Sequence, residues 1–593
     1  MSDVTARFRA AVADQSPHLV DGDPEKFQFS LDKILLKSGT SITLEKVGVT
    51  AIVGANNSGK STVLREVREL LSHNPGAATA DTLSVGSLEV TKSGSAADAL
   101  AWLGQNANLV TQGSQVGFQR MNAGFAMPWA LEQGWASPRP EVGGLTPFLC
   151  FYGDAQGRFG IGGSAELRDS VSDPPVHPVH HLQDSKALFD AVSSITEEIF
   201  RQPLTLDALG RIVRLRVGRV DLPSPPVDNV PPEYRTAMAG LLPLDEQGDG
   251  MRSLLGQLLP IVSATFPLVI IDEPEAFLHP PQAHALGTQL GRLAVERHIQ
   301  VVVATHDRNL LMGLLSSGVD TSVVRLERLA GAGAESHQLK SEDLGALWTD
   351  PVLKYTNVLD GLFHRLVVLA EAEADCGYLA AALDCPQRVA GTVPRSEILF
   401  VPTGGKDGMP KVAAALKAAR VPTVAAPDLD TLSDQTKLRR LVESLGSKWT
   451  DEMSRLWNAA TVDLRATRSP ATVGHVLDAI TAALEGKRAE PYGAEHREMV
   501  RAQMRSSDSP WAAVKSYGLN AFRGAARVAA EALVGLLDEA RVVMVREGEL
   551  ECLAPEVPER KGPGWLQAAL TAGAQCNAET QAHVNRILGA DAP

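Results

Sequence analysis

The chain has 593 residues, of which 44% are hydrophobic and 21% charged, and this ordinary globular composition excludes wholesale disorder. Its 56 basic and 70 acidic residues give a net charge of −14, which excludes binding of nucleic acid through bulk positive charge. A chain of this length is expected to form about three to four domains. Any contact with DNA must therefore use a local basic patch or metal ions held by carboxylates.

The cysteines and the N-terminus give an expectation of the protein's cellular location. The cysteine count is odd and no pair has CxxC spacing, so we expect neither a zinc ribbon nor a disulfide framework, and we expect the reducing cytoplasm. Residues 1–15 lack the apolar core of a signal peptide. No apolar run approaches the ~18 residues of a membrane span, so no membrane partner is expected. The cysteines are Cys150, Cys376, Cys385, Cys552 and Cys576.

Apolar runs and helical spacing alternate along the first half of the chain. The predicted strands are Ile42–Leu44, Val49–Val53, Arg211–Val217, Phe266–Ile271 and Gln300–Ala304. The predicted helices are Val63–Leu71, Ser185–Phe200, Met251–Ser263, Pro281–Glu296 and one after His306. Strand alternating with helix over 250–320 predicts a parallel sheet. Residues 74–180 are rich in Gly, Ser and Ala, and only a hairpin of Leu149–Tyr152 with Arg158–Ile161 is predicted there.

A second α/β pattern begins after a boundary near 345–362. Its predicted strands are Arg365–Ala370, Ile398–Val401, Thr423–Ala426 and Arg541–Val545, and a terminal helix is expected from about Gly564. Residues about 432–540 read as mostly helical. We therefore expect one domain over 1–345, with an insertion in about 74–235, and another over 362–593, with a helical insertion in about 432–540.

A Gly-rich segment between a strand and a helix fits GxxxxGK[ST] from Gly54 to Ser61 without departure. Backbone N–H groups of such a loop wrap phosphates, and the helix N-terminus adds favourable partial charge. Lys60 is predicted to contact the β- and γ-phosphates of ATP, and Ser61 to bind Mg²⁺. The alternative is a chance match in a Gly-rich turn. The predicted nucleotide-binding residues are Gly54, Asn56, Asn57, Ser58, Gly59, Lys60, Ser61 and Thr62.

Three further elements follow. A strand ending at Asp272 and Glu273 predicts a Mg²⁺ ligand and a base that activates the attacking water. His306 ends the next strand, where it is expected to sense the γ-phosphate. A Gly-rich helix start predicts a second anion site for the nucleotide of a partner subunit; its residues are Gly248, Gly250, Arg252 and Ser253. Singly, such acids often cap helices and such a histidine is often structural, but the order of all four elements favours catalysis.

These four elements resemble ATP-binding-cassette (ABC) ATPases, in the branch of RecF, the SMC proteins and the OLD (overcoming lysogenization defect) nucleases. The segments GANNSGKS and IDEPEAFLHPPQ are most similar to OLD-type ATPases, and the resemblance covers roughly 30–320. It implies ATP held between two heads, hence a homodimer or higher homo-oligomer, with Glu273 and His306 as catalytic residues. The segment QGDGMRS departs from the Ser-Gly-Gly core of transporters, which puts its phosphate contact in doubt.

Acidic side chains also follow two predicted strands of the second half. Glu371 and Asp375 come after the strand at 365–370, and Asp428 and Asp430 follow the strand at 423–426. In a parallel sheet both strand ends lie at one edge, where binding sites form. Oxygen ligands without His or Cys suit Mg²⁺ or Mn²⁺, and two such ions polarise a phosphodiester and activate water. The alternative is that these acids only cap helices and solvate loops.

The segments VLAEAEAD, ILFVPTGGKDG and VAAPDLD resemble the TOPRIM domain, a fold shared by topoisomerases, bacterial primases and OLD nucleases. The resemblance covers roughly 362–431 and 541–562. It implies that Glu371, Asp428 and Asp430 bind metal, and that Asp375 matches a further acid of OLD-type versions.

The same resemblance reaches the last part of the chain. It implies further metal ligands at Glu549 and Glu551 and a catalytic lysine at Lys561, with Lys406 as a rival. One departure is Ala372, where the family usually has Gly. If that position needs a positive φ, alanine costs on the order of 1 kcal/mol and the site is weakened.

Basic clusters at Lys437–Arg440 and Arg497–Arg505 lie within the helical insertion. They are candidates for contacts with DNA phosphates, although such clusters are more often a solvated helix face. DNA binding should therefore be local, weak without divalent metal and sensitive to salt.

The order of an ABC-type head and a TOPRIM module resembles OLD-family ATP-dependent nucleases. The first hypothesis is a metal-dependent DNA endonuclease controlled by ATP, in bacterial anti-phage defence or DNA processing. The second is a RecF-like DNA-repair ATPase with a non-cleaving TOPRIM domain. The third is an ATPase sensor or scaffold that controls a partner effector of a defence system.

Overall fold

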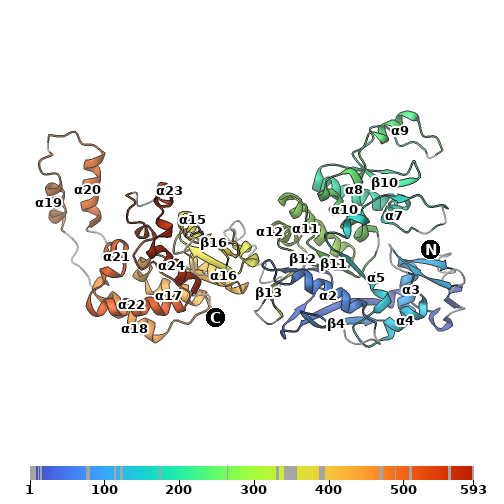
Figure 1. The fold of residues 1–593 in the computed structure, drawn as a ribbon, viewed down its shortest axis with the longest axis horizontal. Coiled ribbons are helices and arrows are strands. Elements are labelled where there is room, and N and C mark those ends of the chain that lie inside the picture. The colour runs from blue at the N-terminus through green and yellow to red at the C-terminus, as the bar shows by residue number, and fades with distance from the viewer. Residues whose placement is uncertain are drawn as a thin grey trace. The chain divides into compact units, whose positions relative to one another are not determined.

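The chain forms two compact units, Met1–Thr349 and Asp350–Pro593, coloured blue to green and yellow to red in Figure 1. Each unit has its own sheet and its own hydrophobic core. The computed structural model describes residues 9–10, 12–13, 16–74, 81–112, 115–120, 125–170, 173, 175–226, 228–263, 265–328, 333–339, 357–385, 394–465, 472–487, 489–506, 511–558 and 563–589.

The first unit is built on a six-stranded sheet with the strand order β14-β13-β3-β12-β11-β7. Its neighbours are parallel except for β13 and β14, which confirms the parallel sheet expected over 250–320. Every residue of β3 and β12 is buried, as in a sheet covered on both faces. The strands are β3 (Gly48–Val53), β7 (Cys150–Gly153), β11 (Leu268–Asp272), β12 (Gln300–Ala304), β13 (Thr321–Arg328) and β14 (Ala334–Leu339).

Glycines bring two of the helices beside this sheet into close contact. A β-carbon added to Gly287 would lie 2.3 Å from the carbonyl oxygen of Leu310, and one added to Gly313 would lie 2.0 Å from that of His284. Only glycine fits at such distances, so α12, which follows His306, is held tightly on α11. The helices of this region are α2 (Lys60–Ser72), α10 (Asp249–Ser263), α11 (Pro280–Glu296) and α12 (Arg308–Ser316).

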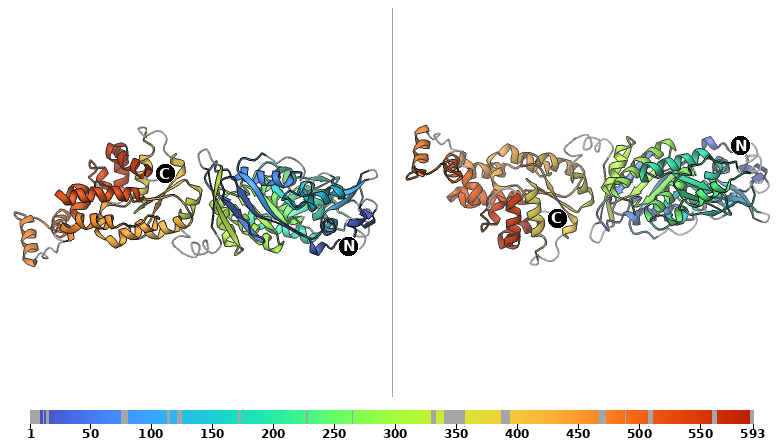
Figure 2. Two further views of the ribbon diagram at one scale, coloured as in Figure 1. Left: turned by 90° about the horizontal axis from the view of Figure 1, so that it is seen from below. Right: turned by 90° about the horizontal axis from the view of Figure 1, so that it is seen from above.

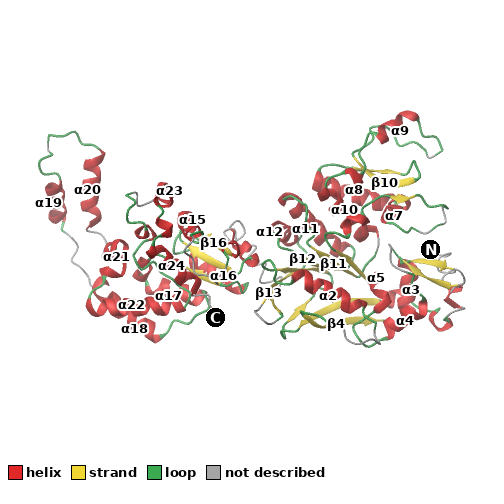
Figure 3. Ribbon diagram, in the orientation of Figure 1, coloured by secondary structure: helices red, strands yellow, loops and turns green. Residues whose placement is uncertain are grey.

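Smaller elements complete the first unit (Figure 3). An antiparallel sheet has the order β2-β1-β4, another has β8-β10-β9, and β5 pairs with β6. The strands are β1 (Gln28–Leu36), β2 (Ser41–Thr43), β4 (Val85–Ser93), β5 (Asn108–Gln112), β6 (Gln115–Gln119), β8 (Ala165–Glu166), β9 (Leu204–Asp207) and β10 (Ile212–Val217). The helices are α3 (Ala96–Asn106), α4 (Pro128–Ala136), α5 (Thr146–Leu149), α6 (Arg158–Ile161), α7 (Pro178–Asp184), α8 (Lys186–Phe200) and α9 (Pro232–Ala239).

The hairpin predicted from Leu149–Tyr152 and Arg158–Ile161 is wrong. Residues Cys150–Gly153 form β7, which pairs in parallel with β11 at the edge of the large sheet, and Arg158–Ile161 form the short helix α6. The apolar run was read correctly as a strand, but its partner lies more than a hundred residues away. The turn between the two segments therefore leads into a helix that buries Arg158 completely.

The second unit has a parallel sheet with the strand order β16-β15-β17. Each residue of the central strand β15 is buried, and the core continues into the C-terminal helices through Tyr378 and Trp565, whose ring centroids are 5.1 Å apart. The strands are β15 (Leu366–Ala370), β16 (Ile398–Pro402) and β17 (Thr423–Ala425). The helices outside the insertion are α15 (Glu373–Ala382), α16 (Met409–Ala418), α23 (Pro563–Ala572) and α24 (Ala578–Gly589).

The strand predicted over Arg541–Val545 is not a regular strand. The segment lies beside β17, but only two isolated parallel bridges join it there, Ala425 with Val542 and Asp428 with Val545. Pro427 stands between the two bridges and has no N–H to donate, which interrupts the ladder. The segment nevertheless carries the residues after it to the edge where Asp428 lies.

Residues 432–540 contain helices, as expected, and Figure 2 shows the outermost of them, drawn in orange, standing apart from the red terminal helices. The helices of this segment are α17 (Gln435–Ser444), α18 (Asp451–Arg465), α19 (Val473–Ala483), α20 (Ala494–Ser506), α21 (Ala512–Tyr517) and α22 (Gly524–Glu539). Across the described part of the chain, none of the helices combines the length and the apolar composition that crossing a bilayer requires.

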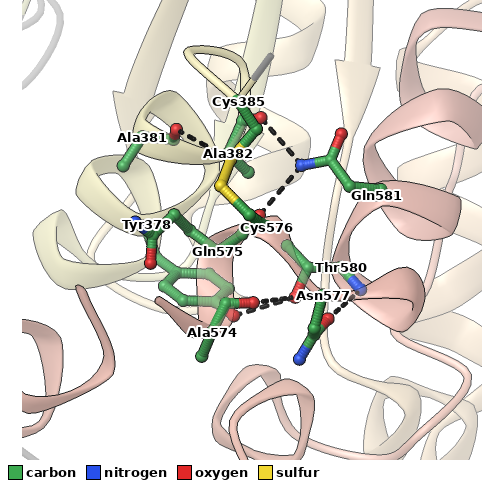
Figure 4. Close-up of a disulfide and its surroundings, with 10 residues drawn as sticks. All are labelled: Tyr378, Ala381, Ala382, Cys385, Ala574, Gln575, Cys576, Asn577, Thr580 and Gln581. Atoms are coloured by element: carbon green, nitrogen blue, oxygen red, sulfur yellow. Dashed lines mark hydrogen bonds between the residues drawn. A yellow bond between two sulfur atoms is a disulfide. The ribbon is translucent and has the colours of Figure 1, made fainter. Parts of the chain in front are cut away.

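The expectation that the cysteines form no disulfide is wrong for one pair. Cys385 and Cys576 are bonded to each other, with their Cα atoms 5.6 Å apart and a sequence separation of 191 (Figure 4). Beside the bond, the Gln581 side chain donates to the Ala382 carbonyl at 2.9 Å, and the Tyr378 hydroxyl lies 2.8 Å from that of Thr580. Spacing rules do not detect so distant a pair, because only the packing of the C-terminal helices on α15 brings it together.

Candidate functional site

The Gly54–Ser61 loop has the backbone that wraps phosphates. It connects β3 to α2, and its left-handed residues are Gly54 (φ 150°), Asn57 (φ 62°) and Gly59 (φ 98°). A β-carbon on Gly54 would lie 2.4 Å from the Leu326 carbonyl oxygen, so this position requires glycine. The loop leads directly into the N-terminus of α2, and a Gly-rich loop at a helix N-terminus suits the binding of an anion.

Lys60 lies at the first position of α2 and is 8% exposed. Its ammonium donates to the carbonyl oxygens of Gly54 at 2.9 Å and Ala55 at 3.1 Å. Burial lowers the pKa of Lys60, and the nearby charges of Glu273, Asp272 and Glu275 oppose that effect. The ammonium therefore sits at the mouth of the phosphate loop beside an acidic group.

The two predicted Mg²⁺ ligands of the first unit meet. The Ser61 hydroxyl donates to Oδ1 of Asp272 at 3.1 Å, and burial raises the pKa of Asp272. Asp272 ends β11, which lies two strands from β3 in the sheet. A hydroxyl and a carboxylate that share one point are the hard oxygen donors that Mg²⁺ takes beside nucleotide phosphates, so the residues present fit the ion.

Glu273 and His306 are also brought together. Nδ1 of His306 lies 3.2 Å from Oε1 of Glu273. Glu273 has a left-handed backbone with φ 48°, and its N–H donates to the Ala304 carbonyl at 2.9 Å. This bond ties the loop after β11 to the end of β12. The predicted base and the predicted γ-phosphate sensor therefore share one edge of the sheet.

Sequence reasoning missed two residues that support this edge. Glu275 is 5% exposed and accepts from the Thr305 hydroxyl at 2.7 Å and from the N–H of His306 at 3.2 Å; burial raises its pKa to about 6. Arg158 donates to the Glu273 carbonyl at 2.6 Å. Glu275 stands in the segment already singled out, whereas Arg158 lies in a segment that was predicted only as a strand of a hairpin.

The Gly248–Ser253 segment opens α10 but does not join the Lys60 group. The Ser253 hydroxyl is buried and donates to the Ala276 carbonyl of the same chain at 3.3 Å. The Arg252 guanidinium lies 3.2 Å from Oδ1 of Asp249 and over the ring of Phe159. The backbone of Gly250 is close to the Phe277 carbonyl, 2.6 Å from an added β-carbon. Contact of this segment with a second subunit's nucleotide stays a prediction.

Three acids of the second unit form a compact group. Glu371 follows β15 and Asp428 and Asp430 follow β17, and their oxygen atoms lie within 4.8 Å of one another. We call these three residues the carboxylate cluster. The N–H of Asp428 donates to Oε1 of Glu371 at 3.4 Å, and Oδ1 of Asp428 accepts from the N–H of Leu550 at 3.0 Å. An all-oxygen donor set of this kind fits Mg²⁺ or Mn²⁺.

The charges of the cluster repel one another. Burial, followed by the charges of Glu371, Asp375, Asp430 and Glu551, raises the pKa of Asp428 to about 8. Burial likewise raises the pKa of Glu371. Like carboxylates that are crowded in this way require protons or a cation to be stable.

The other predicted ligands stand around the cluster. Oδ2 of Asp375 accepts from the N–H of Ala372 at 2.9 Å, and burial raises the pKa of Asp375. Glu549 forms an ion pair at 3.0 Å with Lys515. Glu551 acts on Asp428 through its charge. These acids border the three-residue group, and their metal-binding roles stay predictions.

The lysines at this site differ from expectation. Lys561 lies outside the described residues. Lys406, the rival, is 2.9 Å from Oδ2 of Asp430. Lys515 was not anticipated, yet it lies 3.2 Å from the same oxygen. It belongs to the helical insertion, where the sequence offers no signal because a single lysine in a polar helix is unremarkable.

Ala372 does not carry the strain considered from the sequence. Its φ is −131° and its ψ 168°, which is extended backbone open to any residue. The condition for a weakened site, a positive φ at this position, is therefore not met.

The basic clusters of the insertion are partly neutralised. Lys437 pairs with Asp407 at 2.6 Å and Arg439 with Glu443 at 2.8 Å. In the second cluster Arg501 lies 3.7 Å from Glu498. These pairs are exposed, and such pairs contribute little to stability.

No curated protein matches the chain. Residues 182–313 match the family model "AAA domain, putative AbiEii toxin, Type IV TA system". This segment contains β11 and β12 with Asp272, Glu273 and His306, and the Gly54–Ser61 loop adds the phosphate-binding part. The first unit therefore contains an AAA-type, P-loop ATPase-like domain of mixed α/β fold.

Solved structures similar to the chain include ATPase heads. One is described as the SmcHead bound to the C-winged helix domain of ScpA (14% identity, 53% of this chain, 99% of that chain, TM-score 0.30). Another is cbiO1 from Clostridium perfringens, part of the ABC transporter complex cbiONQ (12% identity, 54% of this chain, 91% of that chain, TM-score 0.29). A third is the SMC head domain from Thermotoga maritima (13% identity, 52% of this chain, 99% of that chain, TM-score 0.26).

Proposed function

We propose that the chain is an ATP-hydrolysing, divalent-metal-dependent DNA endonuclease of the OLD type, whose second unit contains a TOPRIM domain. It acts in the cytoplasm, in bacterial anti-phage defence or DNA processing, as a homodimer or higher homo-oligomer joined through its heads. The observation that carries the proposal is the carboxylate cluster, three acids with oxygens within 4.8 Å of one another, in the same chain as a complete P-loop site.

At the nucleotide site each residue has a distinct task. The amides of the Gly54–Ser61 loop and the Lys60 ammonium hold the phosphates, and Ser61 with Asp272 would hold Mg²⁺. Glu273 accepts a proton from the attacking water, and His306, held 3.2 Å from it, keeps its carboxylate oriented. Arg158 holds the backbone of Glu273 in place by donating a hydrogen bond to its carbonyl oxygen. Binding, orientation and proton transfer are thus supplied by neighbouring elements of one sheet edge.

At the carboxylate cluster, Glu371, Asp428 and Asp430 would hold Mg²⁺ or Mn²⁺. A divalent ion supplies Lewis acidity toward a phosphodiester and lowers the pKa of bound water. The chain itself gathers the acids at one sheet edge, where Asp430 is buried and Glu371 and Asp428 are half-buried. Basic residues of the insertion orient the DNA through its phosphates. ATP-dependent engagement of two heads is the two-state element that controls access to this site.

The test is cleavage of supercoiled plasmid with Mg²⁺ or Mn²⁺, in the presence and absence of ATP. The wild type should cut, and Glu371→Gln and Asp428→Asn should slow cutting about 100-fold or more, because metal ions supply several kcal/mol of charge stabilisation. Glu443→Gln, an acid of the same unit on the exposed face of α17, is the matched control. Lys60→Ala reports whether cutting depends on ATP.

Three results would contradict parts of the proposal. The nuclease role is excluded if the wild type never cuts, or if Glu371→Gln and Asp428→Asn cut as fast as Glu443→Gln. A protein that hydrolyses ATP and binds DNA without cutting would instead be a RecF-like ATPase. The nucleotide assignment is excluded if Lys60→Ala hydrolyses ATP at the wild-type rate.

A further inference from the structure

The helical insertion places a lysine inside the carboxylate cluster. Lys515, on α21, lies 3.2 Å from Oδ2 of Asp430 and 3.0 Å from Oε1 of Glu549. Asp430 is only 6% exposed, and its Oδ2 also pairs with Lys406 at 2.9 Å. Two ammonium groups therefore converge on one carboxylate oxygen of the proposed metal site.

The main chain of Lys515 is held where it is by close backbone contacts. Its carbonyl accepts from the N–H of Glu549 at 3.1 Å and from the thiol of Cys552 at 3.3 Å. Gly548 has φ 123°, and a β-carbon there would lie 2.1 Å from the same carbonyl oxygen. Gly518, one turn further along, would likewise place a β-carbon 2.1 Å from the Arg546 carbonyl oxygen. The position of the Lys515 backbone therefore depends on two glycines, Gly518 in its own segment and Gly548 in the segment that it contacts.

The charges explain why the ammonium is there. Three carboxylates with oxygens within 4.8 Å of one another repel, and a nearby cation relieves that repulsion. The Lys515 ammonium lies within ion-pair distance of two of the acids at this site, Asp430 at 3.2 Å and Glu549 at 3.0 Å. Lys515 therefore acts as a counter-ion of the cluster.

A divalent ion bound at Oδ2 of Asp430 would repel an ammonium group held beside the same oxygen. The lysine side chain is flexible, whereas the backbone of Lys515 is fixed by the contacts above. The ammonium is free to turn away from Asp430 without moving α21. The acids that it leaves are those expected to face the scissile phosphate, so its new partner is an anion of the substrate.

We propose that Lys515 is a counter-ion of Asp430 and Glu549 in the metal-free protein and a ligand of the DNA phosphate when divalent metal is bound. The inference rests on the proposed nuclease function and adds a residue from the helical insertion to that site. It predicts that one substitution, Lys515→Met, strengthens Mn²⁺ binding and slows DNA cutting. A purely structural role of Lys515 would not produce this combination.

The first measurement is Mn²⁺ binding to the full chain by titration calorimetry. Lys515→Met keeps the apolar stem and removes the competing charge, so Mn²⁺ should bind about tenfold more tightly than to the wild type. Lys515→Arg keeps the charge and should stay within about threefold of the wild type. Lys417→Met, an exposed lysine of the same unit that donates to the Glu443 carbonyl, is the control.

The second measurement is plasmid cleavage at saturating Mn²⁺. Lys515→Met should slow cutting about 100-fold, because a positioned cation no longer stabilises charge at the phosphate. Tighter metal binding with slower cutting is the expected signature. The inference is overturned if Lys515→Met binds Mn²⁺ no more tightly than the wild type, or if its cutting at saturating Mn²⁺ equals that of Lys417→Met.

A fold defect and a failure of the proposed function are both distinguishable from this result. Misfolding would weaken Mn²⁺ binding and lower the melting temperature, and Lys515→Arg then still tests the charge. If Asp428→Asn binds Mn²⁺ as well as the wild type, the metal site itself is wrong. If Asp428→Asn abolishes binding and the wild type cuts, but Lys515→Met changes neither quantity, only the role of Lys515 is wrong.

Discussion

The nucleotide site and the carboxylate cluster solve the same electrostatic problem differently. Both place acids at or just beyond the ends of parallel strands: Asp272 is the last residue of β11, and Asp428 follows β17. At the nucleotide site the balancing cation is Lys60, part of the phosphate loop itself. At the carboxylate cluster two lysines pair with Asp430: Lys406, and Lys515, which arrives from an insertion far along the chain.

The nucleotide site is therefore formed largely by residues close in sequence, whereas the carboxylate cluster is assembled from distant segments. The P-loop needs only a strand, a Gly-rich turn and a helix in succession, so its geometry is carried by a few contiguous residues. The carboxylate cluster needs two strand ends, the segment around Leu550 and a helix of the insertion to be in place together. The second site is therefore the one that depends on the whole fold of its unit.

The largest expected effect is at the nucleotide site. Glu273→Gln should slow ATP hydrolysis by about 10²–10⁴-fold, because it removes a general base, while ATP still binds through Lys60 and the loop. Phosphate release and equilibrium binding of a fluorescent ATP analogue measure the two quantities. Equal loss of binding and hydrolysis would show that Glu273 holds nucleotide and does not act as a base.

Loss of the disulfide should affect the second unit alone. Cys385→Ser should lower the free energy of unfolding of that unit by about 2–4 kcal/mol, because the crosslink restrains a long loop in the unfolded chain. Denaturant unfolding followed with and without a reductant measures this. Reductant should shift the wild type and leave Cys385→Ser unchanged; a shift in the unfolding of the first unit would contradict the assignment.

Metal binding at the carboxylate cluster should depend on pH. With its pKa raised to about 8, Asp428 carries a proton below that value in the metal-free protein. Mn²⁺ needs the carboxylate, so its affinity should rise about tenfold per pH unit between about pH 6 and pH 8 and then level off. Calorimetry in buffers of different ionisation enthalpy counts the released proton. Asp428→Asn should remove the pH dependence together with most of the affinity.

The smallest effect concerns Ala372. Because this residue has extended backbone, Ala372→Gly relieves no strain and should lower the stability by at most about 1 kcal/mol through the entropy of the unfolded chain. Mn²⁺ affinity should not change. A clear gain in affinity or in cutting would show that alanine does weaken the site.

Several features of the fold were predictable because they depend on short segments. The strands that end at Val53, Asp272 and Ala304 are contiguous apolar runs, and parallel pairing brings their C-terminal ends to one edge of the first unit's sheet. The hairpin predicted at 149–161 was wrong because strand pairing does not depend on a short segment alone: the partner of β7 is β11 and not its neighbour in sequence.

The sequence by itself determined the P-loop, the acids and the histidine of the nucleotide site, and the three acids of the carboxylate cluster, because each follows a strand directly. Only the tertiary structure decided that Arg158 supports Glu273, that Lys515 neutralises Asp430 and that Cys385 meets Cys576. The physical reason is that hydrophobic periodicity fixes local conformation, whereas the pairing of distant segments follows from how whole faces pack.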